Sequence, residues 1–209
     1  MALVKYNDRS LRNLTTVPAA VTGNSPGALV HIKTLTASSS GTLSFVDGAS
    51  DVVLDSTYPI YKFEFIDIHP SANGTFDFNF SADTGSNYNV TKTSTAFRSI
   101  HSEGDSTSFG YRTAVDLAQS TSFQQLHNNV GNDSDQTVVG KMFLFNPSST
   151  TFVKHFIARM QSYSADDYSQ DYFIAGYGNT TSAIDAIQFK MNSGNIDAGK
   201  IKLYGIKDS

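Results

Sequence analysis

The 209-residue chain contains no cysteine and no tryptophan, and glutamate occurs only at Glu64 and Glu103. The absence of cysteine excludes disulfides, thiol catalysis and thiolate metal ligands. A hydrophobic core, alone or with neighbouring subunits, must therefore stabilise the fold. Charged residues make up only 16% of the chain, and the net charge of −4 argues against a partner bound through phosphate contacts. We expect no nucleic-acid ligand.

Long hydrophobic runs are also absent. No stretch approaches the roughly 20 consecutive apolar residues that a membrane-spanning helix needs. The first residues carry charges at Lys5, Asp8 and Arg9 with no apolar segment behind them, unlike a signal peptide. The sequence therefore predicts no membrane association and synthesis in a cytoplasm.

Aromatic residues are abundant, with 15 phenylalanines and 10 tyrosines. Strands favour aromatic and β-branched residues, whereas helices favour the glutamate, lysine, arginine and leucine that are scarce here. The composition predicts an all-β protein, and the length fits one domain. Residues 1–27 are polar and punctuated by proline and glycine, which predicts an extended N-terminal arm before a single domain at residues 28–209.

Two segments predict the clearest β-hairpin. Residues 60–68 alternate apolar and polar side chains, and the phase changes at Ile66, which predicts a β-bulge. Residues 75–81 alternate without error, with three phenylalanines expected to point inward and Asp77 and Asn79 outward. An Asn-Gly pair between the segments supplies the turn.

The rest of the chain predicts further strands and a second hairpin. The additional strands are expected at residues 28–36, 42–46, 137–146, 151–160 and 172–177. The apolar run within 137–146 predicts burial on both faces, and 113–127 has the only spacing that fits a short helix. The second hairpin joins 187–191 to 200–203. A total of about nine or ten strands predicts an antiparallel β-sandwich, and we expect a jelly-roll-like one.

A cluster of tyrosines and aspartates predicts a glycan-binding site. An aromatic side chain with polar neighbours can stack on a sugar while its hydroxyl reaches water. The candidate residues are Tyr163, Asp166, Asp167, Tyr168, Asp171 and Tyr172. The alternative is that these are ordinary strand residues.

The loop at residues 131–136 gathers oxygen ligands of the kind that calcium prefers. The candidate ligands are Asn132, Asp133 and Asp135. The loop lacks the spacing and the final glutamate of an EF-hand, so a solvated polar turn is the alternative. No other cofactor is expected.

No arrangement of residues identifies a reaction. The five histidines are dispersed, and neither a nucleophile elbow nor a phosphate-binding loop occurs. Carboxylate pairs for glycoside hydrolysis can be drawn in several ways from Glu64, Glu103 and the aspartates of 166–171, and the sequence ranks none of them. We therefore expect a non-enzymatic protein, with a polysaccharide hydrolase as the less favoured alternative.

Three stretches together resemble a family of virion structural proteins from tailed bacteriophages, notably marine cyanophages. They are ASSSGTLSFVDGASDVVLD at 37–55 with YPIY at 58–61 and IHP at 68–70, LFNPSSTTFVKHF at 144–156, and FKMNSGNIDAGKIKLYGI at 189–206. The resemblance implies a capsid decoration, tail or fibre protein, or an adhesin, and it implies no catalytic motif.

The resemblance also sets expectations for location and partners. We expect the chain in the virion, on the particle exterior, as a homo-oligomer and specifically a trimer that contacts other virion proteins. The arm at residues 1–27 would be a docking segment. The alternative is a carbohydrate-binding, receptor-binding module of the phage tail that contacts a host surface glycan.

Overall fold

A computed structural model describes residues 28–208, and these residues contain twelve β-strands and no helix. The strands are β1 (Leu29–Thr36), β2 (Leu43–Val46), β3 (Ile60–Pro70), β4 (Gly74–Ser81), β5 (Lys92–Ser102), β6 (Thr107–Tyr111), β7 (Gln124–Val130), β8 (Val138–Phe145), β9 (Lys154–Tyr163), β10 (Tyr168–Gly178), β11 (Ala186–Met191) and β12 (Ile196–Ile206). The all-β prediction is confirmed. The predicted arm at residues 1–27 lies outside the described residues.

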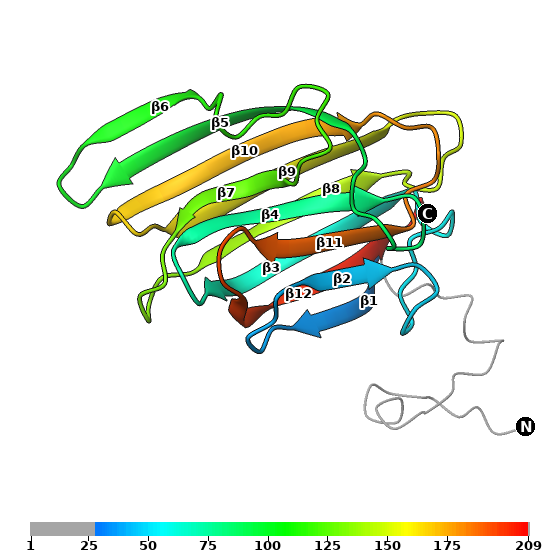
Figure 1. The fold of residues 1–209 in the computed structure, drawn as a ribbon, viewed down its shortest axis with the longest axis horizontal. Helices are drawn as coiled ribbons and strands as arrows, with labels where there is room; N and C mark the ends of the chain where they lie inside the picture. Colours follow the sequence, from blue (N-terminus) through cyan, green and yellow to red (C-terminus); the bar gives the residue numbers. More distant parts are fainter. Residues whose placement is uncertain (1–27, 209) are drawn as a thin grey trace, which may run out of the picture.

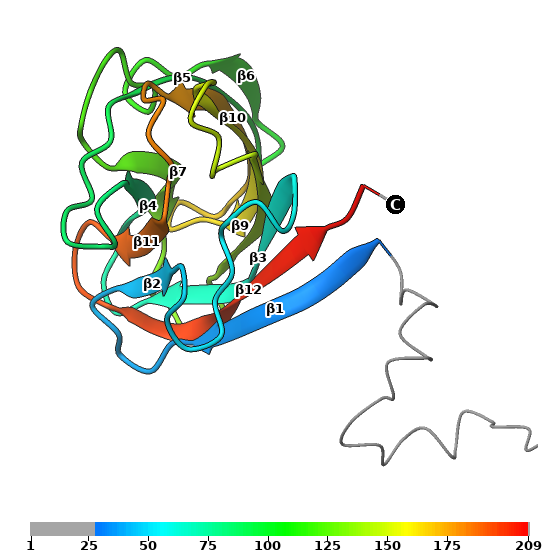
Figure 2. The same ribbon diagram turned by 90° about the vertical axis from the view of Figure 1, so that its right-hand side faces the viewer.

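The strands form two antiparallel sheets that pack face to face (Figures 1 and 2). The larger sheet has eight strands in the order β1-β12-β3-β8-β9-β10-β5-β6, and the smaller has four in the order β2-β11-β4-β7. The predicted antiparallel sandwich is therefore confirmed. The two sheets differ in width, so the smaller sheet covers the inner face of the larger one only in part.

Both predicted hairpins are wrong in their pairing. Strands β3 and β4 follow each other along the chain but lie in different sheets, and the same is true of β11 and β12. Phe65 of β3 and Phe76 of β4 meet across the core with ring centroids 5.3 Å apart. Two strands that face each other across a core and two that pair edge to edge have the same alternation of apolar residues. The sequence pattern therefore does not distinguish the two arrangements.

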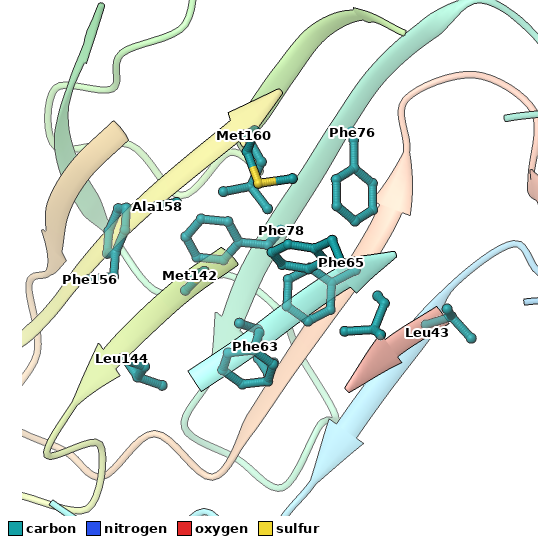
Figure 3. Packing of buried hydrophobic residues seen from close by; sticks show 14 of the residues in the cluster. Leu43, Phe63, Phe65, Phe76, Phe78, Met142, Leu144, Phe156, Ala158 and Met160 are labelled. Carbon is teal, nitrogen blue, oxygen red and sulfur yellow. The ribbon is translucent and has the colours of Figure 1, made fainter. Parts of the chain in front are cut away.

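Phenylalanine rings lie at the centre of the core between the sheets, with leucine, methionine and alanine side chains around them (Figure 3). Phe189 of β11 is fully buried and contacts five other phenylalanine rings, at centroid distances of 5.2 to 6.4 Å. Its partners are Phe45, Phe63, Phe65, Phe76 and Phe78. Three of these contacts are T-shaped or stacked, and such geometries add stability beyond that of the buried area. Phe63 and Phe65 reach Phe189 from the larger sheet, whereas the other three rings belong to the smaller one.

Strand β4 is buried on both faces, which corrects the prediction that Asp77 and Asn79 point outward to solvent. Both side chains are buried, at 6% and 0% exposure. The side-chain amide of Asn79 donates to the carbonyls of Tyr88 (2.6 Å) and Thr121 (2.9 Å). These carbonyls belong to the long β4–β5 and β6–β7 connections, so loops cover the outer face of the smaller sheet. Burial also raises the pKa of Asp77 to about 6.

Two further expectations for single segments are wrong. Residues 113–127 contain no helix, and their C-terminal part enters β7. No helical segment capable of crossing a membrane occurs in the described part of the chain.

Strand β8 was expected to be buried on both faces, but Met142 and Leu144 are buried while Phe143 and Phe145 are half-buried. The reason is that no element of residues 28–208 covers the outer face of the larger sheet.

The predicted bulge in β3 is confirmed. The register of β3 against β8 shifts between Phe65 and Ile68, and Asp67 has a φ of 50°. The neighbouring strand β12 shifts its register at the same level. Gly199 has a φ of 113° there, and a Cβ atom would lie 2.5 Å from the carbonyl oxygen of Asp67. The bulge therefore requires glycine on the adjacent strand.

We expect Phe189→Ala to lower the free energy of unfolding by about 3 to 5 kcal/mol, because it opens a cavity at the centre of the ring cluster. Urea denaturation measures the change. Phe152→Ala is the matched control, because Phe152 is 68% exposed and its loss is expected to cost less than about 0.5 kcal/mol. Equal losses in the two variants would show that Phe189 is not central to the core.

Candidate functional site

Three loops meet at one end of the sandwich, at the left of Figure 1. The N–H of Glu103 in the β5–β6 loop donates to the carbonyl of Asp167 in the β9–β10 turn (3.3 Å). The side-chain amide of Gln136 in the β7–β8 loop donates to the carbonyl of Ser164 (3.2 Å). We call this region the acidic end, and its exposed carboxylates are Glu103, Asp105, Asp133, Asp135, Asp166 and Asp167.

Tyr163 lies where these loops meet. Its hydroxyl donates to Oδ1 of Asp167 (2.8 Å). This hydrogen bond is the main reason that the pKa of Tyr163 rises to about 12, and the nearby negative charges of Glu103 and Asp135 act in the same direction. Tyr163 is therefore a neutral hydrogen-bond donor at any physiological pH, placed among carboxylates from three different loops.

The other residues of the predicted glycan site do not all share this location. Asp166 accepts a hydrogen bond from the side-chain amide of Asn129 (2.7 Å), and Tyr168 is half-buried at the start of β10. Asp171 lies further along β10 and forms a bidentate ion pair with Arg159, with Nη2 2.7 Å from Oδ2 and Nε 3.1 Å from Oδ1. The pair raises the pKa of Arg159.

Tyr172 is a correction to the predicted site, because its side chain is fully buried. Its ring packs edge-on against the ring of His127, with centroids 4.7 Å apart. Burial lowers the pKa of His127 to about 3, so the imidazole is neutral. Alternation along β10 places Asp171 on the outer face and Tyr172 in the core, and the sequence cluster therefore divides between two sides of the sheet.

The predicted calcium loop joins the acidic end. Asn132, Asp133 and Asp135 are all exposed, and the N–H of Gln136 donates to the carbonyl of Asp133 (2.9 Å). No group of three histidine or acidic side chains within residues 28–208 is arranged to hold a metal ion. Calcium binding at this loop stays a prediction.

Sequence reasoning missed that the glycan and calcium candidates adjoin each other. Residues 131–136 and 163–168 lie about 30 positions apart, and the link between them is the inward-pointing side chain of Gln136, which is 2% exposed. A glutamine in a polar loop carries no sequence signal of burial. The isolated bridge between Val130 and Ser164 brings the two loops together.

The opposite end of the sandwich contains two lysines that the sequence did not single out. Lys92 and Lys154 flank Gly178 on neighbouring strands, and both are fully buried. The Nζ of Lys92 donates to Oδ1 of Asn79 and to the carbonyl of Val90 (2.8 Å). The Nζ of Lys154 donates to the carbonyl of Phe152 (2.7 Å). Because burial disfavours the charged form, the pKa of Lys92 falls to about 7.

Comparison with protein-family models, with curated proteins and with solved structures gave no match. The function of the chain is therefore inferred from its residues, its fold and the geometry of its surface.

The buried amine of Lys92 predicts a pH dependence of stability. Its pKa is lower in the folded chain than in the unfolded chain, so the unfolded state binds more protons between about pH 7 and pH 10. The free energy of unfolding should therefore rise with pH in that window. We expect the gain from pH 7 to pH 9.5 to be on the order of 2 kcal/mol larger in the wild type than in Lys92→Met.

Urea denaturation at the two pH values measures this difference. Lys33→Met is the control, because Lys33 lies on the edge strand β1 and its replacement should leave the pH dependence as in the wild type. The same pH dependence in wild type and Lys92→Met would show that Lys92 keeps its ordinary pKa.

Proposed function

We propose that the chain is a non-enzymatic structural protein of a bacteriophage virion, placed on the particle exterior as a capsid decoration or a tail or fibre component, and assembled as a homo-oligomer. The observation that supports this proposal is the connectivity of the strands. Four strands of the larger sheet run in the order β1-β12-β3-β8, and the smaller sheet runs β2-β11-β4-β7. Along the chain, successive strands of these eight lie in opposite sheets, except β4 and β7, which pair with each other in the smaller sheet.

We further propose that these eight strands are a jelly roll, the two-sheet Greek-key fold found in viral capsid and lectin domains. The remaining strands are then two insertions, β5–β6 between β4 and β7, and β9–β10 between β8 and β11. Strand β10 pairs with β5, so both insertions widen the same sheet. Each inserted pair is a true hairpin in the larger sheet.

The phage resemblance falls almost entirely on the eight-strand framework. The stretch at 37–55 contains β2, and the stretch at 144–156 contains the β8–β9 turn with the first residues of β9. The stretch at 189–206 contains the second half of β11 and all of β12. The inserted β5–β6 hairpin lies outside all three. This distribution supports a structural framework shared with that family, and the β5–β6 hairpin lies outside the segments that carry the resemblance.

A second candidate function is a carbohydrate-binding adhesin module of the phage tail. The observation in its favour is the acidic end, where Tyr163 and Tyr168 lie among exposed carboxylates from three loops. Carboxylates accept hydrogen bonds from sugar hydroxyls, and the tyrosine rings offer apolar surface beside them. Loop ends of a rigid sandwich are a common place for binding residues.

Immunogold electron microscopy of purified particles tests the virion proposal, with antibody raised against this chain. Label on the head is expected for a decoration protein, and label on the tail or fibres for a tail component or adhesin. Particles from an unrelated phage serve as the control. Absence of label on both intact and disrupted particles would contradict the virion proposal.

Glycan-array binding of the purified chain tests the adhesin candidate. We expect Tyr168→Ala to weaken any specific glycan binding by roughly 10-fold, through loss of ring contact. Tyr177→Ala is the matched control, because Tyr177 is also half-buried on β10 but lies at the far end of that strand. Equal weakening in both variants, or no binding by the wild type, would contradict a glycan site at the acidic end.

A further inference from the structure

Strand β6 ends the larger sheet and lacks the features that protect an edge strand. Among the described strands it pairs with β5, and its other side has no partner. Its sequence, Thr-Ser-Phe-Gly-Tyr, contains no charge and no proline, and every residue except Gly110 is exposed. Natural sheet edges are usually blocked by lysine, proline or a bulge, because a free edge recruits another strand. The opposite edge of the sheet, β1, carries Lys33.

The hydrogen bonds between β5 and β6 show which backbone groups of β6 are free. The N–H of Ser102 donates to the carbonyl of Ser106 (2.9 Å), and the N–H of Arg112 donates to the carbonyl of Ala96 (2.9 Å). In an antiparallel pair such hydrogen-bonded positions recur at every second residue. The even-numbered residues of β6 therefore bond to β5.

The odd-numbered residues direct their N–H and C=O groups away from β5, toward the open side. They are Thr107, Phe109 and Tyr111. Their side chains lie on the outer face of the larger sheet, because their register partners on β5 include Phe97, which is on that face. The open edge thus offers a row of free backbone groups beside two large aromatic side chains.

An aromatic patch continues inward from this edge. Phe109 is 72% exposed, Tyr111 53% and Phe97 37%. The rings of Phe97 and Phe109 are 5.7 Å apart, and Phe97 stacks on Phe173 of β10 at 4.9 Å. The guanidinium of Arg159 lies over the Phe173 ring at 4.8 Å. Several adjoining exposed aromatic side chains on one face are typical of an interaction surface.

We propose that β6 pairs with β6 of a second copy of this chain across a two-fold axis, centred on Phe109. Antiparallel pairing in this register places Phe109 opposite Phe109 of the partner copy and Thr107 opposite Tyr111. Every N–H and C=O that β6 leaves free then gains a backbone partner. The two aromatic patches join across the axis, and the larger sheets of the two copies become continuous.

A second copy is the occupant that fits this strand, because the strand is complementary to itself. Centring on Phe109 sets the small side chain of Thr107 against the large one of Tyr111, and Ser108 against Gly110 on the other face. β6 contains no charged residue, so the side chains of two paired β6 strands do not repel each other. The carboxylate of Asp116 accepts a hydrogen bond from the Tyr111 hydroxyl (2.6 Å) at the end of the strand. A two-fold contact pairs the β6 edges of the two copies with each other. The dimer then has no free β6 edge, so this contact does not extend into a fibre.

The size of the patch indicates a concentration-dependent dimer. An aromatic side chain buries about 150 to 250 Å² when fully covered, and a stable interface buries about 800 Å² on each partner. Three partly exposed rings and one short strand provide less than that. The proposal rests on the homo-oligomer of the proposed function but not on its location in a virion. The expected trimer would use a different surface.

Cysteine cross-linking tests the register, and the absence of native cysteine removes any background. Phe109→Cys should form a disulfide dimer under mild oxidation, because opposed Cα atoms at a hydrogen-bonded position lie about 5.5 Å apart, within disulfide range. Thr107→Cys by itself should not, because its two copies are offset along the strands. A mixture of Thr107→Cys and Tyr111→Cys should cross-link. Equal cross-linking of Phe109→Cys and Thr107→Cys would overturn the proposal.

A proline variant tests the same contact without oxidation. Phe109→Pro removes an N–H that points away from β5, so the fold keeps its internal hydrogen bonds while the pairing of copies loses two at the axis. Sedimentation should show a concentration-dependent dimer for the wild type and for Phe152→Ser, and at least a 10-fold weaker dimer for Phe109→Pro. Circular dichroism checks the fold of each variant. If Phe109→Pro is misfolded, the cross-linking pattern of the cysteine variants tests the proposal instead.

The outcomes separate this contact from the proposed function. A wild-type chain that stays monomeric at all concentrations overturns the β6 contact and the homo-oligomer together. A trimer without Phe109→Cys cross-linking keeps the homo-oligomer and overturns the β6 contact. Failure of immunogold labelling affects the virion location and leaves the dimer result unchanged.

Discussion

The packing of phenylalanine rings between two sheets of unequal width is the constraint on which the rest of this structure depends. Phe189 of the smaller sheet contacts rings from both sheets, so its strand fixes how far apart and in what register the layers lie. Because aromatic rings pack edge to face at defined distances, a shift of one strand by one residue would replace the ring cluster with polar side chains. The core therefore specifies the sandwich.

The unequal width of the two sheets decides which parts of the sandwich are exposed to solvent. The four-stranded sheet covers only part of the inner face of its partner, and loops rather than strands cover its own outer face. The outer face of the eight-stranded sheet is open, with aromatic and charged residues side by side on β5, β9 and β10. The hairpins β5–β6 and β9–β10 contribute to both regions of interest. Their turns form the acidic end together with the β7–β8 loop, and β6 forms the uncharged edge.

Several features follow from local sequence and are present in the structure. The strand at 60–68, its bulge and the inward phenylalanines of 75–81 are correct because each depends on residues that are neighbours along the chain. The errors concern what lies across space. Asp77 and Asn79 are polar residues at alternate positions, and only the distant carbonyls of Tyr88 and Thr121 explain why they are buried.

The sequence by itself determined the all-β class, most strand positions and the residue types at the candidate site. Those properties depend on the amino-acid composition and on the alternation of apolar and polar residues, and both can be read along the chain without knowing which segments meet in space. The tertiary structure decided which strands pair and which face each other, because both arrangements satisfy the same alternation. It also decided that Tyr172 is in the core while Tyr163 meets three loops, since the partners of each side chain come from strands and loops far away in the chain.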